Sequence, residues 1–406
     1  MSVSTPEIDD ELLPPWEELA TDDGFVYYLD RGKHATQLTH PRTGKIKRIP
    51  RDLPQGWTKQ VEEATGKIAF IKEETQEKTY IDPRLASAVE ADPQTMGQLR
   101  QRFNSGTSAL EVLEGQDLTG KVAIVTGANT GIGYETALSL ALHGCEVIFA
   151  CRNEATTGKA IAKIKRIKHS AGKACKFIKI DLASLRSTKE FADQVKAQYK
   201  HIDMLILNAG VYSPPQHLTE DGFETTFQVC HLSHFYLTLL LSDTFDHTSR
   251  IIVVSSELHR ASFLRTSDIN ESMLAAPPRT FISYSAYNDA KLCNVMFAFE
   301  LAKRWRSRGI AVFALHPGSL VSTEINRNYW FWRLFFVLIR PFTKSVQQAA
   351  STTVYCATAP ELNGLTGLYF NNCYICGPAD STRNERKQRL LWEFSESLIE
   401  RATKDF

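Results

Sequence analysis

The sequence predicts an α/β protein in which a doubly wound parallel-sheet domain follows two small all-β units. Three observations predict this fold. Apolar runs of strand length alternate with amphipathic stretches of helix length over the last two thirds of the chain. A glycine-rich turn follows the first of these runs. The N-terminal region contains two similar segments of about forty residues, each with a Trp and a closing Pro.

The composition describes an ordinary globular protein. The 406 residues are 43% hydrophobic and 23% charged, and the net charge is +1. This balance gives no overall attraction to nucleic acid, so we expect no nucleic-acid partner. The eight cysteines are scattered through apolar segments, which is typical of reduced thiols in a cytosolic-type compartment. The pair Cys373 and Cys376 lacks a second pair or a His cluster, so we favour a packing role and expect no metal site.

The N-terminus and the most apolar run are the two places to look for a targeting signal or a membrane segment. The first residues, MSVSTPEIDDELLPPW, are acidic and lack an apolar core, which argues against a signal peptide or a mitochondrial presequence. The run YWFWRLFFVLI, from Tyr329 to Ile339, is too short to span a bilayer and contains Arg333. It is either a cover over an active site or an anchor at a membrane surface. We therefore expect no transmembrane segment, and peripheral membrane contact stays open.

The first two units are predicted to span residues 1–48 and 49–84. Each contains Leu-Pro, then a Trp (Trp16 or Trp57), a Gly-containing turn, alternating apolar residues, and a closing proline (Pro41 or Pro83). Short alternating runs between polar turns indicate a three-stranded antiparallel meander. Such small domains have a marginal core, and a Trp packed between prolines would hold them together.

Both units resemble WW domains, which bind proline-rich peptides in a slot between aromatic side chains. The resemblance implies that the slot of the first unit is formed by Tyr27 and by Leu38, which stands where the family has a second Trp. The second unit has Ala69 and Tyr80 at these positions. Losing one aromatic wall removes much of a contact that contributes about 1–3 kcal/mol. We expect weak binding of Pro-Pro-x-Tyr-type peptides by the first unit and a supporting role for the second.

The rest of the chain divides into a linker, residues 85–117, and a large domain, residues 118–406. The linker is polar and includes one short predicted helix, SALEVLEG. Because the predicted strands are apolar on both faces, we expect a parallel sheet with helices on both sides. These strands are KVAIVT (121–126), EVIFA (146–150), KFIKI (176–180), DMLILN (203–208), RIIVVS (250–255) and IAVFAL (310–315).

The glycine-rich turn, TGANTGIGYE, lies between the first of these strands and a helix. Glycines there allow the backbone to approach a pyrophosphate, and the helix N-terminus offers free N–H groups and a positive dipole end. The spacing differs from G-x-G-x-x-G, but the mechanism is the same, and it predicts a Rossmann-type dinucleotide site. The predicted contacts from this turn are Gly127, Asn129, Thr130, Gly131, Ile132 and Gly133.

Later strand ends supply the rest of the predicted cofactor site. Arg152 follows the second strand, where an acidic residue would bind the ribose of NAD and an Arg suits the 2′-phosphate of NADP. We therefore favour NADP over NAD. Asp181 and Leu182, after the third strand, would border the adenine. The segment NAG after the fourth strand would line the middle of the cofactor; its residues are Asn208, Ala209 and Gly210.

With this layout the large domain resembles the short-chain dehydrogenase/reductase family. The matching motifs are TGANTGIG, NAG, a serine pair at a strand end, Tyr287-x-x-x-Lys291, and Pro317-Gly318. The resemblance implies that Tyr287 donates or accepts the proton, that Lys291 binds the nicotinamide ribose and lowers the pKa of Tyr287, and that Ser256 polarises the substrate oxygen. It also implies that Ser322 holds the carboxamide beside Pro317 and Gly318.

Simple electrostatics supports the pairing of Tyr287 with Lys291. A free Tyr has a pKa near 10. An ammonium roughly 5 Å away would stabilise the phenolate by about 3 kcal/mol at an effective dielectric near 20. The family's relay Asn is replaced here by Cys230, a weak hydrogen-bonding group, and this replacement weakens the relay.

The whole chain resembles oxidoreductases that carry WW domains. The apolar run near Tyr329 predicts an apolar substrate, such as a steroid- or retinoid-like alcohol or ketone. One hypothesis is therefore an NADP-dependent oxidoreductase with peptide-docking modules. The other is an adaptor whose dehydrogenase fold senses cofactor with little turnover. The resemblance implies a role in stress signalling or apoptosis, and residence in the cytoplasm, with the nucleus and mitochondria as further locations.

Overall fold

The computed structural model describes most of the chain. The described residues are 12–21, 24–32, 35–37, 40–42, 47–50, 52–62, 68–90, 102–212, 217–262, 264, 269–275, 283–318, 344–404 and 406. Three predicted features fall outside these residues: Leu38, Ser322, and the apolar run from Tyr329 to Ile339.

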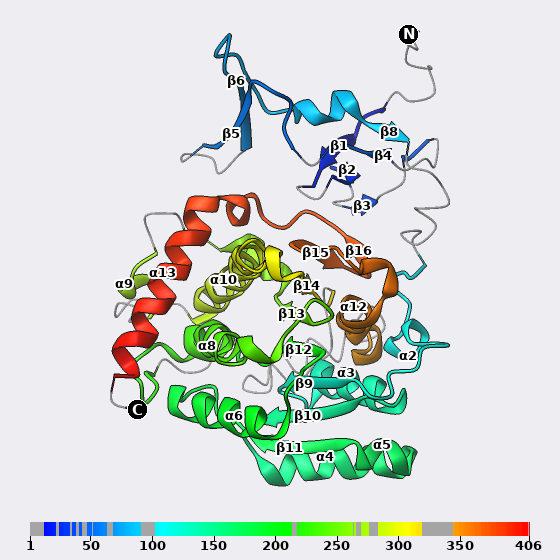
Figure 1. The fold of residues 1–406 in the computed structure, drawn as a ribbon, viewed down its shortest axis with the longest axis vertical. Coiled ribbons are helices and arrows are strands. Elements are labelled where there is room, and N and C mark those ends of the chain that lie inside the picture. The colour runs from blue at the N-terminus through cyan, green and yellow to red at the C-terminus, as the bar shows by residue number, and fades with distance from the viewer. Residues whose placement is uncertain are drawn as a thin grey trace.

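The N-terminal part forms two small antiparallel sheets, as predicted (Figure 1). The first has the order β1-β2-β3, from Trp16–Ala20, Val26–Asp30 and Ala35–Gln37. The second has the order β5-β6-β7, from Trp57–Val61, Ile68–Lys72 and Lys78–Thr79. A further pair joins β4 (Lys47–Arg48) to β8 (Val89–Glu90), so chain beyond the second unit returns to pair with the end of the first.

The core of the first unit lies on one face of its sheet. Val26 and Tyr28 are fully buried there and pack with Ile49 and the partly buried Trp16. The ring of His40 meets the Tyr28 ring edge-on at 5.1 Å. Because side chains alternate along a strand, Tyr27 lies on the opposite face.

The large domain is built on one eight-stranded sheet with the order β11-β10-β9-β12-β13-β14-β15-β16. Its neighbours are parallel as far as β15, and only β16 is antiparallel. All six predicted strands are confirmed. Their bounds are β9 Val122–Thr126, β10 Glu146–Cys151, β11 Cys175–Lys179, β12 Met204–Leu207, β13 Arg250–Val254 and β14 Ala311–His316.

Two strands toward one edge of the large sheet were not predicted from the sequence. They are β15 (Leu368–Asn371) and β16 (Tyr374–Ile375). They are short and are joined by a tight turn in which Asn372 and Cys373 have positive φ angles of 53° and 63°. Such a hairpin lacks the long apolar run that marked the six predicted strands. Cys373 is therefore a turn residue, and all eight cysteines are free.

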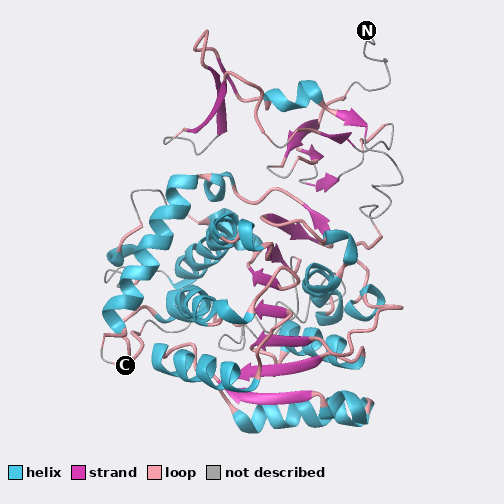
Figure 2. Cartoon of the chain, viewed as in Figure 1, coloured by secondary structure: helices cyan, strands magenta, loops and turns pink. Residues whose placement is uncertain are grey.

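Helices cover both faces of this sheet, which confirms the doubly wound arrangement (Figures 1 and 2). In β9, Ala123 and Val125 point into one core and Ile124 into the other. The first core includes side chains of α3 (Gly131–Leu142), α4 (Glu154–Ile167), α5 (His169–Lys173) and α12 (Val346–Thr358). The second includes side chains of α6 (Leu185–Gln198), α8 (Ser233–Leu240), α10 (Ser283–Arg304) and α13 (Glu385–Ala402).

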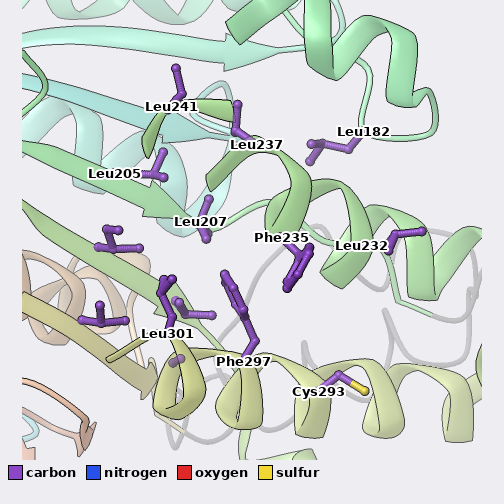
Figure 3. Close-up of a cluster of buried hydrophobic side chains, with 14 of the residues drawn as sticks. Leu182, Leu205, Leu207, Leu232, Phe235, Leu237, Leu241, Cys293, Phe297 and Leu301 are labelled. Carbon is purple, nitrogen blue, oxygen red and sulfur yellow. The ribbon is translucent and has the colours of Figure 1, made fainter. Parts of the chain in front are cut away.

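The second core is rich in leucine and phenylalanine. Figure 3 shows Leu205 and Leu207 of β12 facing Phe235 of α8 and Phe297 of α10. The rings of Phe235 and Phe297 lie 5.3 Å apart, and Trp392 of α13 packs edge-on against Phe235 at 4.7 Å. Burying a side chain of this size contributes about 1.5–3 kcal/mol, so these contacts hold α10 firmly on the sheet.

Shorter elements complete the fold. The helix predicted at residues 108–115 appears as α2 (Ala109–Val112), with a capping box between Ser108 and Glu111. Val112 and Leu113 are buried in the first core, so this helix packs as part of the large domain. Two further short helices are α7 (Thr225–Phe227) and α9 (Glu271–Leu274). None of the described helices is long and apolar enough to cross a membrane.

Candidate active site

The glycine-rich turn connects β9 to α3 in a backbone path that excludes side chains at two positions. Gly127 has a φ of 68°, and a Cβ there would lie 3.1 Å from the Cα of Ala209. A Cβ on Gly133 would lie 2.4 Å from the carbonyl oxygen of Gly127 and 2.5 Å from Nδ2 of Asn208. The turn therefore packs directly on the NAG segment that follows β12.

Thr126, the last residue of β9, joins these two segments. Its Oγ1 accepts hydrogen bonds from the backbone N–H groups of Asn208 and Ala209, both at 2.9 Å. Asn208 Nδ2 in turn donates to the Thr126 carbonyl at 2.9 Å. Nε2 of His234 lies 3.0 Å from the same hydroxyl, and burial, with the nearby Lys291 charge, lowers the pKa of His234 to about 3. Thr126 belongs to the quoted motif, but its bonding role depends on contacts the sequence does not display.

The residues of the turn fit the pyrophosphate of a dinucleotide. Helix α3 begins at Gly131, and Thr130 before it makes no side-chain cap. The first N–H groups of the helix, at Gly131 and Ile132, are thus available to an anion at its positive end. When bound there, a nicotinamide dinucleotide supplies or accepts the hydride.

Arg152 lies beside this turn, at the end of β10, and its side chain is exposed. Around it, Asn129 Nδ2 donates to Thr156 Oγ1 at 2.8 Å, and Asn153 caps α4 by accepting from the Thr156 N–H at 2.9 Å. The arrangement places an Arg and a helix N-terminus at the same strand end. These groups suit a phosphate.

The remaining cofactor candidates also lie at strand ends. After β11, Oδ1 of Asp181 accepts from the Ala183 N–H at 3.0 Å, and the buried Leu182 accepts from Ser233 Oγ at 2.7 Å. After β14, the N–H of Gly318 donates to Nδ1 of His316 at 3.2 Å. Pro317 lies between them, and Gly318 has a φ of 107°. Ser322 lies outside the described residues.

Tyr287, Ser256 and Lys291 meet at the end of the sheet. Tyr287 is on α10 and only 7% exposed, and the Ser256 side chain lies near enough to lower the pKa of its hydroxyl group. Lys291 follows one helical turn later, with Nζ 5.6 Å from the centre of the Tyr287 ring. The Tyr212 ring packs edge-on against Tyr287 at 5.0 Å. Tyr212 was not predicted, because the sequence places no motif around it.

The electrostatic expectation for Tyr287 requires a correction. Lys291 does not lower the pKa of Tyr287 in this arrangement; burial raises that pKa, Cys230 adds to the rise, and the nearby Ser256 side chain offsets only part of it. Burial likewise lowers the pKa of Lys291. The physical reason is that Lys291 Nζ donates to the Val254 carbonyl at 2.8 Å, and desolvation of the phenol is the larger effect. Tyr287 is thus a protonated phenol at neutral pH.

The two serines at the end of β13 have different surroundings. Ser255 is buried and its Oγ donates to the Lys291 carbonyl at 2.7 Å. Ser256 is half-buried, accepts from the Leu258 N–H at 3.3 Å, and caps the 3-10 helix Glu257–Ala261. Ser255 therefore bonds backbone, while Ser256 faces Tyr287.

Cys230 lies beside Lys291 in an unusual helical segment. Residues Gln228–Leu232 form a π-helix between α7 and α8, a distortion that often occurs at functional sites. Cys230 is fully buried, and its Sγ accepts from the Val211 N–H at 3.4 Å. A Cβ on Gly210 would lie 3.3 Å from this sulfur and 3.5 Å from Lys291 Nζ.

Two histidines brace the same corner and were not predicted. Nδ1 of His259 bonds the Ser256 carbonyl at 2.6 Å, and its Nε2 accepts from the Ala379 N–H at 3.0 Å. Because an acceptor nitrogen carries no proton, His259 is the Nδ1–H tautomer. His316 forms an ion-pair contact with Glu257 at 2.8 Å. The contacts of His259 with Ala379 and of His316 with Glu257 join residues distant in sequence, and no local pattern signals them.

These features define the class. A doubly wound sheet with a glycine-rich turn after its first strand, and Ser, Tyr and Lys gathered at the same sheet edge, is an NAD(P)-dependent short-chain dehydrogenase/reductase. A family model for short chain dehydrogenase matches residues 121–267.

Whole-chain comparisons extend this assignment. The chain is 54% identical over 399 residues to a WW domain-containing oxidoreductase of Drosophila melanogaster, covering 98% of both chains. It is 46% identical to the protein of that name from Homo sapiens, covering 97% of this chain and 95% of the relative. The chain belongs to the WW domain-containing oxidoreductase family.

More distant similarities cover about three quarters of the chain. Retinol dehydrogenase 12 of Mus musculus is 36% identical and covers 75% of this chain, with 93% of the relative matched. A solved structure of an uncharacterised protein from Mycobacterium paratuberculosis is 27% identical, with a TM-score of 0.57, covering 73% of this chain and 98% of that one.

Proposed function

We propose that this oxidoreductase uses NADP(H) to interconvert an apolar carbonyl and alcohol, with Tyr287 as the proton donor to the carbonyl oxygen. The observation that carries this proposal is the placement of the Ser256 and Tyr287 side chains close to one another beside Lys291. Ser256 would hold the substrate oxygen, and Lys291 would orient the cofactor ribose. A phenol whose pKa is raised keeps its proton at neutral pH, which favours carbonyl reduction.

The test is NADPH consumption by the full chain with a panel of apolar ketones and aldehydes. Tyr287→Phe should lower kcat/KM by about 10²- to 10⁴-fold, because the ring packing is kept and only the proton is lost. Tyr236→Phe, at a half-buried position on α8, is the matched control and should keep full activity. Equal background rates for all three proteins would remove the enzymatic proposal for those substrates.

The preference for NADP is supported by Arg152, exposed at the end of β10 beside Asn129 and Thr156. Arg152→Ala should raise the KM for NADPH by about tenfold, the loss of a charge-assisted contact, and leave the KM for NADH nearly unchanged. Arg166→Ala, near the other end of α4, controls for the change in net charge. An equal effect of Arg152→Ala on both cofactors would contradict the preference.

An apolar substrate of retinoid or steroid type is supported by two observations. The Tyr212 ring packs beside Tyr287, so an aromatic wall borders the reacting phenol. The chain is also similar to a protein named retinol dehydrogenase 12. Comparing kcat/KM for retinal, a steroid ketone and a short polar ketone tests this class, and preference for the polar ketone would exclude it.

We also propose that the first WW unit docks proline-rich partners through Tyr27, which makes the chain an adaptor as well as an enzyme. Cys230 at the relay position is only a weak hydrogen-bond donor and acceptor, which favours the alternative in which adaptor function dominates and turnover is slow. A Pro-Pro-x-Tyr peptide titrated against the full chain and Tyr27→Ala tests the docking. Identical binding by both proteins would exclude Tyr27 as the peptide contact.

A further inference from the structure

Tyr27 is buried although it faces away from the core of its own domain. Its strand neighbours Val26 and Tyr28 fill that core, so the Tyr27 ring lies on the opposite face of the three-stranded sheet. A sheet this small has one core face, and its other face would be open to water in an isolated unit. Yet Tyr27 is only 2% exposed. Another part of the chain must cover it.

The covering segment comes from the large domain. We define the docking segment as residues 374–383, which include β16 and the 3-10 helix Asp380–Arg383. Arg383 Nη2 donates to the Tyr27 hydroxyl at 2.7 Å. A Cβ on Gly377 would lie 3.4 Å from the same hydroxyl, so the backbone of the docking segment passes directly against it.

A second strand of the first unit makes the same contact. Thr36 Oγ1 donates to the carbonyl of Ile375 at 3.2 Å, so β3 lies beside β16 (Figure 1). Thr36 lies opposite Leu29 in the sheet register, and Leu29 is two residues from Tyr27, so Thr36 and Tyr27 lie on the same face of the sheet. The face that the resemblance assigns to peptide binding is thus the face that contacts the docking segment.

The site also has the chemistry and the access that a peptide needs. Pro378 of the docking segment lines the same cleft as Tyr27, Thr36 and Arg383. This cleft has a volume of about 1830 Å³ and runs between the N-terminal sheets and the large domain. A Gly-Pro segment beside the aromatic slot offers the contact that an external proline peptide would offer.

The docking segment is anchored to the corner that carries Ser256. The Gly377 carbonyl accepts from Arg260, and the Ala379 N–H donates to Nε2 of His259. His259 in turn bonds the Ser256 carbonyl. The docking segment is therefore held by the large domain whether or not the first WW unit rests on it.

We propose that the docking segment is an internal ligand of the Tyr27 face, so that an external proline-rich peptide binds only after the first WW unit leaves it. This proposal rests on the peptide docking proposed above. Its physical consequence is that the apparent affinity of the full chain for a peptide is reduced by the fraction of molecules in which the face is open.

The first experiment measures peptide affinity in the full chain. A fluorescent Pro-Pro-x-Tyr peptide is titrated against the wild type, Arg383→Ala and the control Arg389→Ala. Arg389 is an exposed residue of α13 near Glu385. Replacing it with Ala removes the same charge as Arg383→Ala but leaves the contact with the first unit in place. Arg383→Ala should bind the peptide about tenfold more tightly than the wild type does. The wild type and Arg389→Ala should have equal dissociation constants. Equal dissociation constants for all three would overturn the proposal.

The second experiment needs no peptide. Hydrogen exchange is followed in fragments covering residues 35–37 and 374–383 of the same three proteins. Arg383→Ala should exchange faster than the wild type in both fragments, while Arg389→Ala should match the wild type. Thr36→Val, which removes the other contact, provides a second variant if Arg383→Ala folds poorly. Unchanged exchange in the variants that remove a contact would overturn the proposal.

The two experiments separate the proposals. Faster exchange without peptide binding by any protein would support the internal contact and contradict the peptide docking of the first unit. Equal peptide binding with unchanged exchange would support peptide docking and overturn the internal contact.

Discussion

Ser255 Oγ donates a 2.7 Å hydrogen bond to the main-chain carbonyl of Lys291. This bond fastens the end of β13 to α10 at the point where the strand presents Ser256 and the helix presents Tyr287. A second hydrogen bond joins the same helix and strand, because Lys291 Nζ donates to the Val254 carbonyl at 2.8 Å. The relative position of the two reacting hydroxyls is thus set by bonds between their neighbours.

Ser255→Ala should therefore loosen the site without touching a reacting group. We expect a loss of about 1 kcal/mol in unfolding free energy, the ordinary contribution of a buried hydrogen bond, measured by urea unfolding. We also expect kcat to fall several-fold while the KM for the cofactor stays constant. Ser255→Thr keeps the hydroxyl and serves as the control. A kcat unchanged in Ser255→Ala would show that this bond does not position Ser256.

Gly133→Ala should block dinucleotide binding. The added Cβ would lie 2.4 Å from the Gly127 carbonyl, a distance that real Cβ atoms do not adopt, so the turn must shift. We expect dinucleotide affinity by calorimetry to fall at least tenfold, because the backbone no longer fits the pyrophosphate.

Gly158→Ala is the matched control for this change. A Cβ at Gly158, within α4, meets nothing within 4 Å. Alanine in a helix interior is more stable than glycine by about 1 kcal/mol, so Gly158→Ala should bind cofactor normally and unfold at a higher temperature. Equal cofactor affinity in both variants would show that the glycine turn does not contact the cofactor.

The pH dependence of activity follows from the raised pKa of Tyr287. Reduction needs the protonated phenol, which burial favours, so its rate should be flat from about pH 6 to about pH 9 and fall only at higher pH. Oxidation of the alcohol needs the ionised form and should rise with pH. Measuring kcat/KM in both directions tests this, and a reduction rate that falls between about pH 6 and about pH 8 would contradict it.

The same shift affects stability with a definite sign. An unfolded Tyr loses its proton near pH 10, while the folded chain holds it to higher pH. Stability associated with Tyr287 is therefore complete below about pH 10 and is lost as the pH rises toward the folded pKa. Tyr287→Phe should show a smaller loss of unfolding free energy over this range than the wild type.

Cys230→Ala should have a small effect on turnover. The sulfur bonds the backbone of Val211, whereas Lys291 is already held by the Val254 carbonyl. We expect kcat within about threefold of the wild type and a stability loss of about 1 kcal/mol from the small cavity. Cys293→Ala controls for the cavity, because Cys293 is also a fully buried cysteine and packs in the second core. A collapse of kcat in Cys230→Ala alone would assign the sulfur a direct part in proton transfer.

The sequence by itself determined six strands of the large sheet, the glycine turn and the spacing of Tyr287 and Lys291. These features depend on local patterns: apolar runs that are buried on both faces, small residues where backbone must approach a ligand, and a one-turn helical spacing. A residue's neighbours in sequence are enough to specify each of them.

Only the tertiary structure decided the direction of the Tyr287 pKa shift, the role of Thr126 and the burial of Tyr27. Each depends on groups brought from far along the chain: Thr126 bonds a residue 83 positions away and Tyr27 bonds one 356 positions away. Desolvation likewise depends on everything packed around the phenol, and not on the nearest charge alone. Packing between distant segments therefore set the proton state of the site and covered the face that the sequence assigned to peptides.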